Sequence, residues 1–462
     1  MEYSNQINLI FFAISCLLTT LALYFKKNKI LFIIIIQGLF LDIFSLQYKA
    51  NISILKLLGI ILLFIEISKF RELKRYKVSQ TMFLITFFLM ASLMVPLIFP
   101  WEQDFPFFPW AHDFSLLTYK YNLIIAVKQF FTFCSELGCI LFIGRLFFES
   151  ESVSLKPVLI IILLSVLGIY LEKIFKIDIF HVFTGGTEML LEGRARGLTY
   201  EPRAASYYMA IIIASLTIFP IKLTLKILLI LLSSGAFVFA NSMTGTVILF
   251  TSLTIVLLCG ITLRTRFLKS YLRTLIIITL SGVIFFQLPY SIYIKKHLLS
   301  RSYILSSQRI VERLESAESA VLNFYISNPK YLFFGLGVGQ APVATSKYLT
   351  KEKLKWWGNG LTYLPFMGIF LILANGGLFL LALYIAIIIY GLKEVLKMDI
   401  DKDKRDLLFT FACLFLGTYF IQVRYFHILG FAILLYAEMY NKNQNGTKSE
   451  KHIEKQSLSS VL

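Results

Sequence analysis

Long apolar runs recur along this chain and limit what it can fold into. A membrane-spanning helix needs about 20 mostly apolar residues. Runs of that kind begin near Ile7, Ile30, Ile52, Met82, Leu123, Val158, Ala204, Leu223, Gly245, Leu272, Gly376, Leu407 and Phe426. Because each run is expected to be a helix, the chain is predicted to be an all-α polytopic membrane protein with about 12–13 transmembrane helices.

The composition supports a membrane protein and argues against a nucleic-acid partner. Only 16% of the residues are charged and 57% are hydrophobic, whereas about a quarter of the residues of a soluble domain are charged. The net charge is +18, but the basic residues fall in short clusters between apolar runs, as they do in cytoplasmic loops. Nucleic-acid binding is therefore not expected.

The basic loops also predict the orientation of the helices. Lys and Arg concentrate in short cytoplasmic loops, and the basic short segments here are 26–29, 69–77, 264–273, 393–405 and the tail from Lys442. They fall on one side of the membrane if the spans alternate from an outside N-terminus. Three long connections, 100–120, 176–203 and 289–359, are then extracytoplasmic.

This topology divides the chain into six segments. They are N-terminal helices (1–175), a first functional extracytoplasmic loop (176–203), central helices (204–288), a long, partly helical extracytoplasmic loop (289–359), C-terminal helices (360–440) and a polar tail predicted to be disordered and cytoplasmic (441–462).

The long loop carries an unusual amount of positive charge. It holds ten Lys or Arg against four Glu, which suits an anionic ligand at the outer leaflet. From Ser307 its apolar residues follow the three-and-four spacing of an amphipathic helix, which should end before Asn328 and Pro329. Arg309 and Arg313 on this helix either bind an anion or pair with nearby glutamates.

The segment 193–206 is the strongest candidate for a functional site. It places Arg194, Arg196 and Arg203, together with Glu201, at the mouth of the helix expected to begin near Ala204. A planar guanidinium grips phosphate oxygens bidentately, so a phosphate or diphosphate is the expected partner. The alternative is an ordinary charged loop in which glutamates neutralise the arginines.

Other polar features carry weaker predictions. The segment 335–339, Gly-Leu-Gly-Val-Gly, lacks the βαβ setting of a dinucleotide site and is expected to be a tight backbone turn. Lys128 and Glu136 lie inside one apolar run and either relay protons or, as we expect, pair with each other or with a neighbouring helix. The five histidines show no metal-ligand spacing, so no metal or other cofactor is expected.

Three motifs together resemble the O-antigen polymerase and ligase superfamily of bacterial envelope glycosyltransferases. They are R-x-R-G-x-x-x-E-P at 194–202, Ser-Met-Thr-Gly-Thr at 242–246, and N-P-x-x-x-x-x-G-x-G-x-G at 328–339. The resemblance covers about residues 180–440. It implies a multi-pass protein of the bacterial inner membrane whose active face is periplasmic.

The resemblance implies the reaction as well. Such enzymes use oligosaccharides carried on undecaprenyl diphosphate. A polymerase joins repeat units into a cell-surface polysaccharide, O-antigen or capsule, with a chain-length regulator as a partner, whereas a ligase moves the chain to lipid A core. In ligases of this superfamily a histidine near the end of the long loop is the expected general base. The corresponding segment here, 356–363, contains no histidine, which favours the polymerase.

A flippase for lipid-linked sugars is a further alternative, which would predict an internal repeat and broken helices at the membrane midplane.

The expected chemistry assigns roles to seven residues. Cations that stabilise the leaving diphosphate make a metal unnecessary, and Arg194 and Arg196 are assigned that role. Glu201 is assigned as the general base, with the alternative that it holds an arginine in place. The substrate-binding residues are predicted to be Arg203, Arg309, Arg313 and Arg424.

Overall fold

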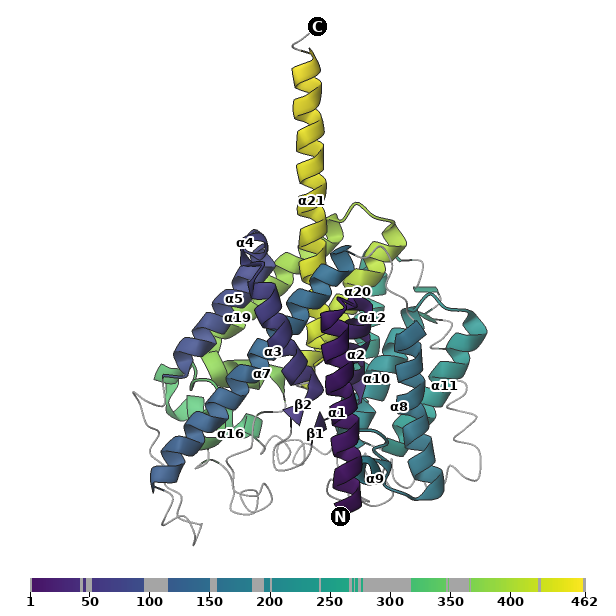
Figure 1. The fold of residues 1–462 in the computed structure, drawn as a ribbon, viewed down its shortest axis with the longest axis vertical. Helices are drawn as coiled ribbons and strands as arrows, with labels where there is room; N and C mark the ends of the chain where they lie inside the picture. The colour runs from purple at the N-terminus through teal and green to yellow at the C-terminus, as the bar shows by residue number, and fades with distance from the viewer. Residues whose placement is uncertain are drawn as a thin grey trace.

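A computed structural model shows the chain as a bundle of helices (Figure 1). It describes residues 2–41, 45–46, 52–94, 115–149, 156–184, 195–199, 202–240, 242–265, 268–269, 271–272, 276, 317–345, 348, 365, 367–422 and 425–459.

The first half of the chain contributes ten helices and two short strands among the described residues. They are α1 (Glu2–Tyr24), α2 (Asn28–Phe40), β1 (Ser45–Leu46), β2 (Ile52–Ser53), α3 (Ile54–Ile67), α4 (Phe70–Leu73), α5 (Lys77–Ser92), α7 (Ser115–Glu149), α8 (Lys156–Phe175), α9 (Ile179–Thr184), α10 (Pro202–Ile218) and α11 (Leu223–Ala240). The strands pair antiparallel, with Ser45 opposite Ser53 and Leu46 opposite Ile52.

The second half adds further helices on both sides of the long loop. They are α12 (Met243–Leu263), α16 (Ala317–Ser327), the 3₁₀ helix η4 (Pro329–Tyr331), α17 (Ala341–Ala344), α19 (Gly368–Lys397), α20 (Lys402–Ile421) and α21 (His427–Ser459).

Several of these helices have the length and composition to cross a bilayer. Among the described residues five do so: parts of α7 and α8, all of α11, most of α12, and α19. Shorter apolar helices include parts of α1 and α2 and all of α5. The chain is therefore a helical membrane protein, as the sequence predicted, while a total of 12–13 spans stays a prediction.

The two ends of the bundle separate the two kinds of loop. Figure 1 shows the N-terminus, β1, β2, α9 and α16 at one end, and α4 and the C-terminal part of α21 at the other. We call these the α9 end and the basic end. The basic end carries the Lys-rich segment 69–77 and the start of the tail, as the alternating topology predicted. That the α9 end faces away from the cytoplasm stays a prediction from the distribution of Lys and Arg.

Helix α10 lies at the centre of the bundle. All its residues are buried except Arg203 and Ser215, which are half-buried. A helix that is covered on every side must be surrounded by other helices, and α10 contacts α8, α11, α12 and α20. Gly245 of α12 packs so closely on α10 that a Cβ there would overlap the hydroxyl of Ser206.

Helix α19 is broken near its N-terminal end. Gly377 has φ of 62°, which interrupts the helical ladder. The backbone N–H and carbonyl groups that lose their helical partners at the break bond to the segment 332–336. The N–H of Leu378 donates to the carbonyl of Leu332 (2.9 Å), and the N–H of Leu336 donates to the carbonyl of Ala374 (2.8 Å). Non-helical backbone in a membrane protein is tolerated where its N–H and carbonyl groups find hydrogen-bond partners within the protein.

The glycines of segment 335–339 make the tight turn that the sequence predicted. Gly335, Gly337 and Gly339 all have positive φ, between 70° and 94°, a region that residues with a Cβ rarely adopt. A Cβ on Gly335 would lie 2.6 Å from the backbone nitrogens of Gly376 and Gly377. The turn is thus shaped to dock on the break in α19.

Two predictions about helix ends have different outcomes. Helix α16 stops at Ser327, directly before Asn328 and Pro329, as predicted; its expected beginning at 307–316 lies outside the described residues. Helix α21 continues to Ser459, and disorder of the segment 441–462 stays a prediction from its polar composition.

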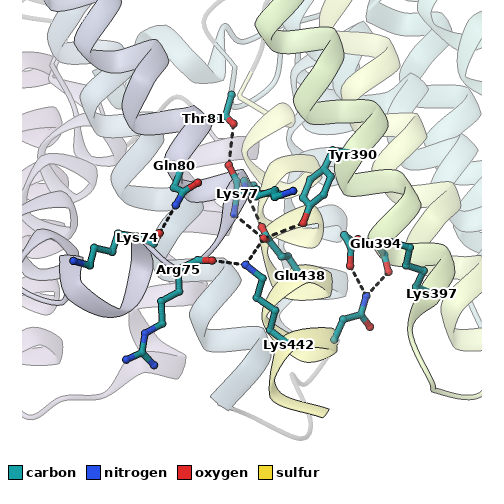
Figure 2. A network of polar contacts seen from close by, with 12 residues as sticks. Lys74, Arg75, Lys77, Gln80, Thr81, Tyr390, Glu394, Lys397, Glu438 and Lys442 are labelled. Atoms are coloured by element: carbon teal, nitrogen blue, oxygen red, sulfur yellow. Dashed lines mark hydrogen bonds and ion pairs between the residues drawn. The ribbon is translucent and has the colours of Figure 1, made fainter. Parts of the chain in front are cut away.

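A buried carboxylate ties three helices together at the basic end (Figure 2). Glu438 of α21 is fully buried and accepts hydrogen bonds from the backbone N–H groups of Lys77 (2.6 Å) and Val78 (2.8 Å) and from the hydroxyl of Tyr390 (3.1 Å). Lys442 forms an ion pair with it (3.0 Å). Lys77 and Val78 are the first residues of α5, so Glu438 caps a helix to which it does not belong.

We predict that Glu438→Gln lowers the free energy of unfolding by about 2 kcal/mol, because it removes charge-assisted hydrogen bonds from a buried site. The measurement is the thermal unfolding midpoint in detergent micelles. Glu72→Gln is the matched control, since Glu72 is exposed in α4 and should change stability by less than about 0.5 kcal/mol. Equal midpoints for the two variants would contradict the capping role.

Candidate functional site

The structure places two of the seven residues that the sequence assigned to the site. Arg196 lies in the turn 195–199, and Arg203 is the second residue of α10. The other five lie outside the described residues: Arg194, Glu201, Arg309, Arg313 and Arg424.

Arg196 is buried in a bidentate ion pair. Its Nη2 lies 2.6 Å from Asp178 Oδ2 and its Nε 3.0 Å from Oδ1. The guanidinium carbon lies 4.7 Å from the centre of the Phe180 ring, in cation–π geometry. With 1% of Arg196 and 4% of Asp178 exposed, the aspartate already neutralises the guanidinium that was expected to face a diphosphate.

A second carboxylate holds the backbone of the same turn. Glu172 of α8 accepts the N–H groups of Arg196 (3.0 Å) and Gly197 (2.7 Å), one on each oxygen. Gly197 has φ of 57°, and a Cβ there would lie 2.8 Å from the backbone nitrogen of Ile169. A glycine is therefore required at position 197, where the turn meets α8.

Sequence reasoning missed two carboxylates that hold Arg196. They are Glu172 and Asp178, 24 and 18 residues upstream, whereas Glu201, which was also considered for this role, lies outside the described residues. One signal was available, because Glu172 stands within the apolar run 158–175 and a carboxylate there needs a partner.

Three segments that the sequence singled out meet around the beginning of α10. The turn 195–199 is tied to α11, where the N–H of Ala195 donates to Phe239 (3.0 Å). The segment 242–246, expected to be a turn, forms the beginning of α12 and touches α10 through Gly245. The third segment is the connection before α21, where the Phe426 ring lies 5.8 Å from that of Tyr207 and 5.7 Å from that of Tyr208.

Arg203 occupies the centre of this arrangement. It follows Pro202, the first residue of α10, where proline fits because the N–H it lacks would have no partner within the helix. The N–H groups of a first helical turn also have no intrahelical acceptor and carry partial positive charge. Arg203, which is half-buried, adds its guanidinium to the same turn.

The glycine-rich loop docks on a different part of the bundle. The N–H of Val338 donates to the hydroxyl of Ser92 at the end of α5 (3.1 Å), and that of Gly339 donates to Asn375 Oδ1 beside the break in α19 (3.2 Å). The hydroxyl of Tyr325 in α16 donates to Leu373 (2.7 Å), and burial raises its pKa, so that it remains a neutral donor. This loop anchors the described part of the long segment between α12 and α19 to α5 and α19.

Glu136 was predicted to pair with Lys128 or with a neighbouring helix, and it pairs with the neighbouring helix α21. Its Oε2 lies 3.2 Å from Nε2 of His427, the first residue of α21. Both residues are buried. They line a cavity of about 20 Å³ together with Met82, Ile85, Thr86, Leu89, Phe133, Leu137, Ile140, Tyr384 and Phe431. The sequence treated His427 only as part of a scattered set, because its partner is 291 residues away.

The fold and these sites define a helical membrane protein with buried ionic pairs and an arginine in the first turn of its central helix. No protein-family model, curated protein or solved structure matches this chain.

We predict that Asp178→Ala destabilises the protein by about 3 kcal/mol, because it leaves the Arg196 guanidinium buried without a countercharge. The thermal midpoint in detergent measures this loss. Adding Arg196→Met to the same variant should recover part of it, since the uncompensated charge is then gone.

Glu149→Gln is the control for this pair, because Glu149 forms a partly exposed ion pair with Arg145 worth less than about 1 kcal/mol. A double variant less stable than Asp178→Ala alone would contradict the role given to the Arg196–Asp178 pair.

Proposed function

We propose that this protein is a metal-independent glycosyltransferase that polymerises oligosaccharide repeat units carried on undecaprenyl diphosphate. The product is a cell-surface polysaccharide, O-antigen or capsule. One observation carries the proposal: the arginine turn, the segment 242–246 and the connection before α21 lie together around the beginning of α10. The first two of these belong to the motifs that resemble the O-antigen polymerase and ligase superfamily.

The buried ion pair changes the role proposed for Arg196. Because Asp178 neutralises its guanidinium, Arg196 is a positioning residue that holds the turn in place for its neighbours. Arg194 and Arg203, on either side of that turn, then stabilise the leaving diphosphate. Arg309, Arg313 and Arg424 stay proposed as further contacts to the anionic substrate, and Glu201 as a partner of the arginines or as the general base.

A flippase was expected to have broken helices at the membrane midplane together with an internal repeat. The break at Gly377 lies nine residues (377 − 368) inside the apolar span Gly368–Lys397 and is filled by the glycine-rich loop 335–339. The motifs at 194–202, 242–246 and 328–339 therefore carry the preference for an enzyme.

The proposed setting follows from the same topology. The α9 end, with the beginning of α10, is placed on the periplasmic side of the bacterial inner membrane, where lipid-linked repeat units arrive. The partners are the bilayer, the undecaprenyl-diphosphate oligosaccharide and a chain-length regulator.

The test is the polysaccharide ladder of cells that lack this protein, complemented with wild type or Arg203→Ala at matched protein level. Deletion should leave lipid A core capped by a single repeat unit, and wild type should restore the ladder. Arg203→Ala should lower the rate of polymerisation about a hundredfold, because one charge-assisted contact to the leaving group contributes about 3 kcal/mol. Arg71→Ala, at an exposed position in α4, is the control and should restore the ladder fully.

Two outcomes would overturn parts of this proposal. Bare core, with polymer accumulating on undecaprenyl diphosphate, would make the protein a ligase. A full ladder from Arg203→Ala would remove this arginine from the mechanism.

A further inference from the structure

The exposed face of helix α16 is apolar on one side and polar on the other. Successive residues of an α-helix are about 100° apart, so Leu322 and Ile326 form one stripe, and Asn323 and Ser327 form the next. Leu322 is 51% exposed and Ile326 is 70% exposed, and the two polar residues are exposed as well. We call these pairs the apolar stripe and the polar stripe.

The apolar stripe of α16 does not belong to a membrane span. The helix has 11 described residues, which is about 16 Å at 1.5 Å per residue, whereas a span must cross about 30 Å. A polar stripe beside an apolar one is instead typical of a helix that lies on a bilayer surface, with one flank in lipid and the other in water.

The two stripes border different neighbours. Glu318 and Tyr325, on the side of the apolar stripe, contact the beginning of α19: Glu318 Oε1 accepts the N–H of the residue before α19 (3.1 Å), and the Tyr325 hydroxyl donates to Leu373 (2.7 Å). On the side of the polar stripe, the Phe324 ring lies 5.7 Å from that of Tyr331. The apolar stripe therefore follows the flank of α16 that packs on an apolar span.

Two phenylalanines shortly after α16 extend its apolar surface. Phe333 and Phe334 follow η4 and are 54% and 62% exposed. Their ring centres lie 6.3 Å and 6.4 Å from that of Phe379 in α19, which in turn lies 5.2 Å from that of Phe88 in α5. This aromatic cluster joins the segment after α16 to two apolar helices of the bundle.

The same surface continues along α5. This helix is apolar, contacts α19 and exposes large apolar residues at three- and four-residue spacing, which places them on one face. They are Leu84, Phe87, Met90 and Met94. An exposed apolar face of this kind on a membrane protein is a surface for lipid. Through the aromatic cluster it leads to Phe333 and Phe334.

A cation and an aromatic ring stand beside these phenylalanines. Lys330 of η4 is exposed, and its Nζ lies 5.1 Å from the centre of the Tyr331 ring. Aromatic rings are enriched at the level of the lipid headgroups, and a lysine there can keep its ammonium group in the polar layer while its stem covers apolar surface. The segment 330–334 thus has the composition of a membrane interface.

We propose that α16 and η4 form an interfacial element that binds the bilayer surface at the α9 end, where Figure 1 shows α16. The apolar stripe, Phe333 and Phe334 lie among the outermost acyl chains, and the polar stripe faces water. The partner is the headgroup and upper acyl-chain region of one leaflet, into which such helices bury their apolar side by about 5–10 Å. This placement does not depend on the proposed reaction.

Lipid contact at this element would hold the glycine-rich loop at a fixed depth. The loop begins directly after Phe334, and the N–H of Leu336 within it donates to the carbonyl of Ala374 beside the break in α19. On its other side α16 buries Val321 and Phe324 against Leu336. The element therefore lies between the lipid surface and the loop that fills the break.

The test measures the depth of single nitroxide labels in proteoliposomes by electron paramagnetic resonance. Labels are attached at Ile326→Cys, Phe334→Cys, Asn323→Cys and Ser327→Cys, and their collision rates with oxygen and with a water-soluble nickel chelate are compared. Oxygen concentrates in the apolar part of the bilayer, and the chelate stays in water. Wild-type protein taken through the same labelling gives the background from its five cysteines.

Two further labels provide the reference values. Phe87→Cys lies on the exposed apolar face of α5 and reports lipid, and Arg71→Cys at an exposed position of α4 reports water. The ratio of oxygen to nickel collisions at Ile326→Cys and Phe334→Cys should be close to that at Phe87→Cys. The ratio at Asn323→Cys and Ser327→Cys should be close to that at Arg71→Cys.

Two results would overturn the proposal. If all four labels behave like Arg71→Cys, the apolar stripe lies in water and is a surface for a protein partner. If all four behave like Phe87→Cys, the segment is immersed in the bilayer and does not lie at its surface. Leu322→Cys and Phe333→Cys replace Ile326→Cys and Phe334→Cys if a thermal unfolding midpoint below that of wild type shows that either variant is misfolded.

Discussion

A charge buried among apolar helices must have a partner, because removal from water costs several kcal/mol that only pairing or hydrogen bonding offsets. Most of the connections described above meet this requirement. Asp178 pairs with Arg196, Glu438 caps α5, and Glu136 meets His427. Each contact joins elements that are distant in the sequence, so the same groups that are costly to bury also determine which helices lie together.

This requirement also determines the role of Arg196. Its guanidinium pairs with the buried Asp178, and Glu172 accepts the backbone N–H groups of the same turn. These two carboxylates hold the turn 195–199 in place.

Much of the architecture followed from local patterns. Twelve of the thirteen apolar runs coincide with described helices, since the length and composition that let a segment cross a bilayer are readable from the segment alone. Pro329 marked the end of α16, and the glycines of 335–339 marked a tight turn.

The sequence by itself determined that the chain is a helical membrane protein, approximately where its helices begin, and which loops carry positive charge, because these properties depend on neighbouring residues. Only the tertiary structure decided that Arg196 is neutralised, that Glu438 caps a helix more than 350 residues away in the chain, and that Glu136 finds His427. Ion pairs act through space over a few ångströms, and no local pattern encodes which distant residue the fold will bring within that range.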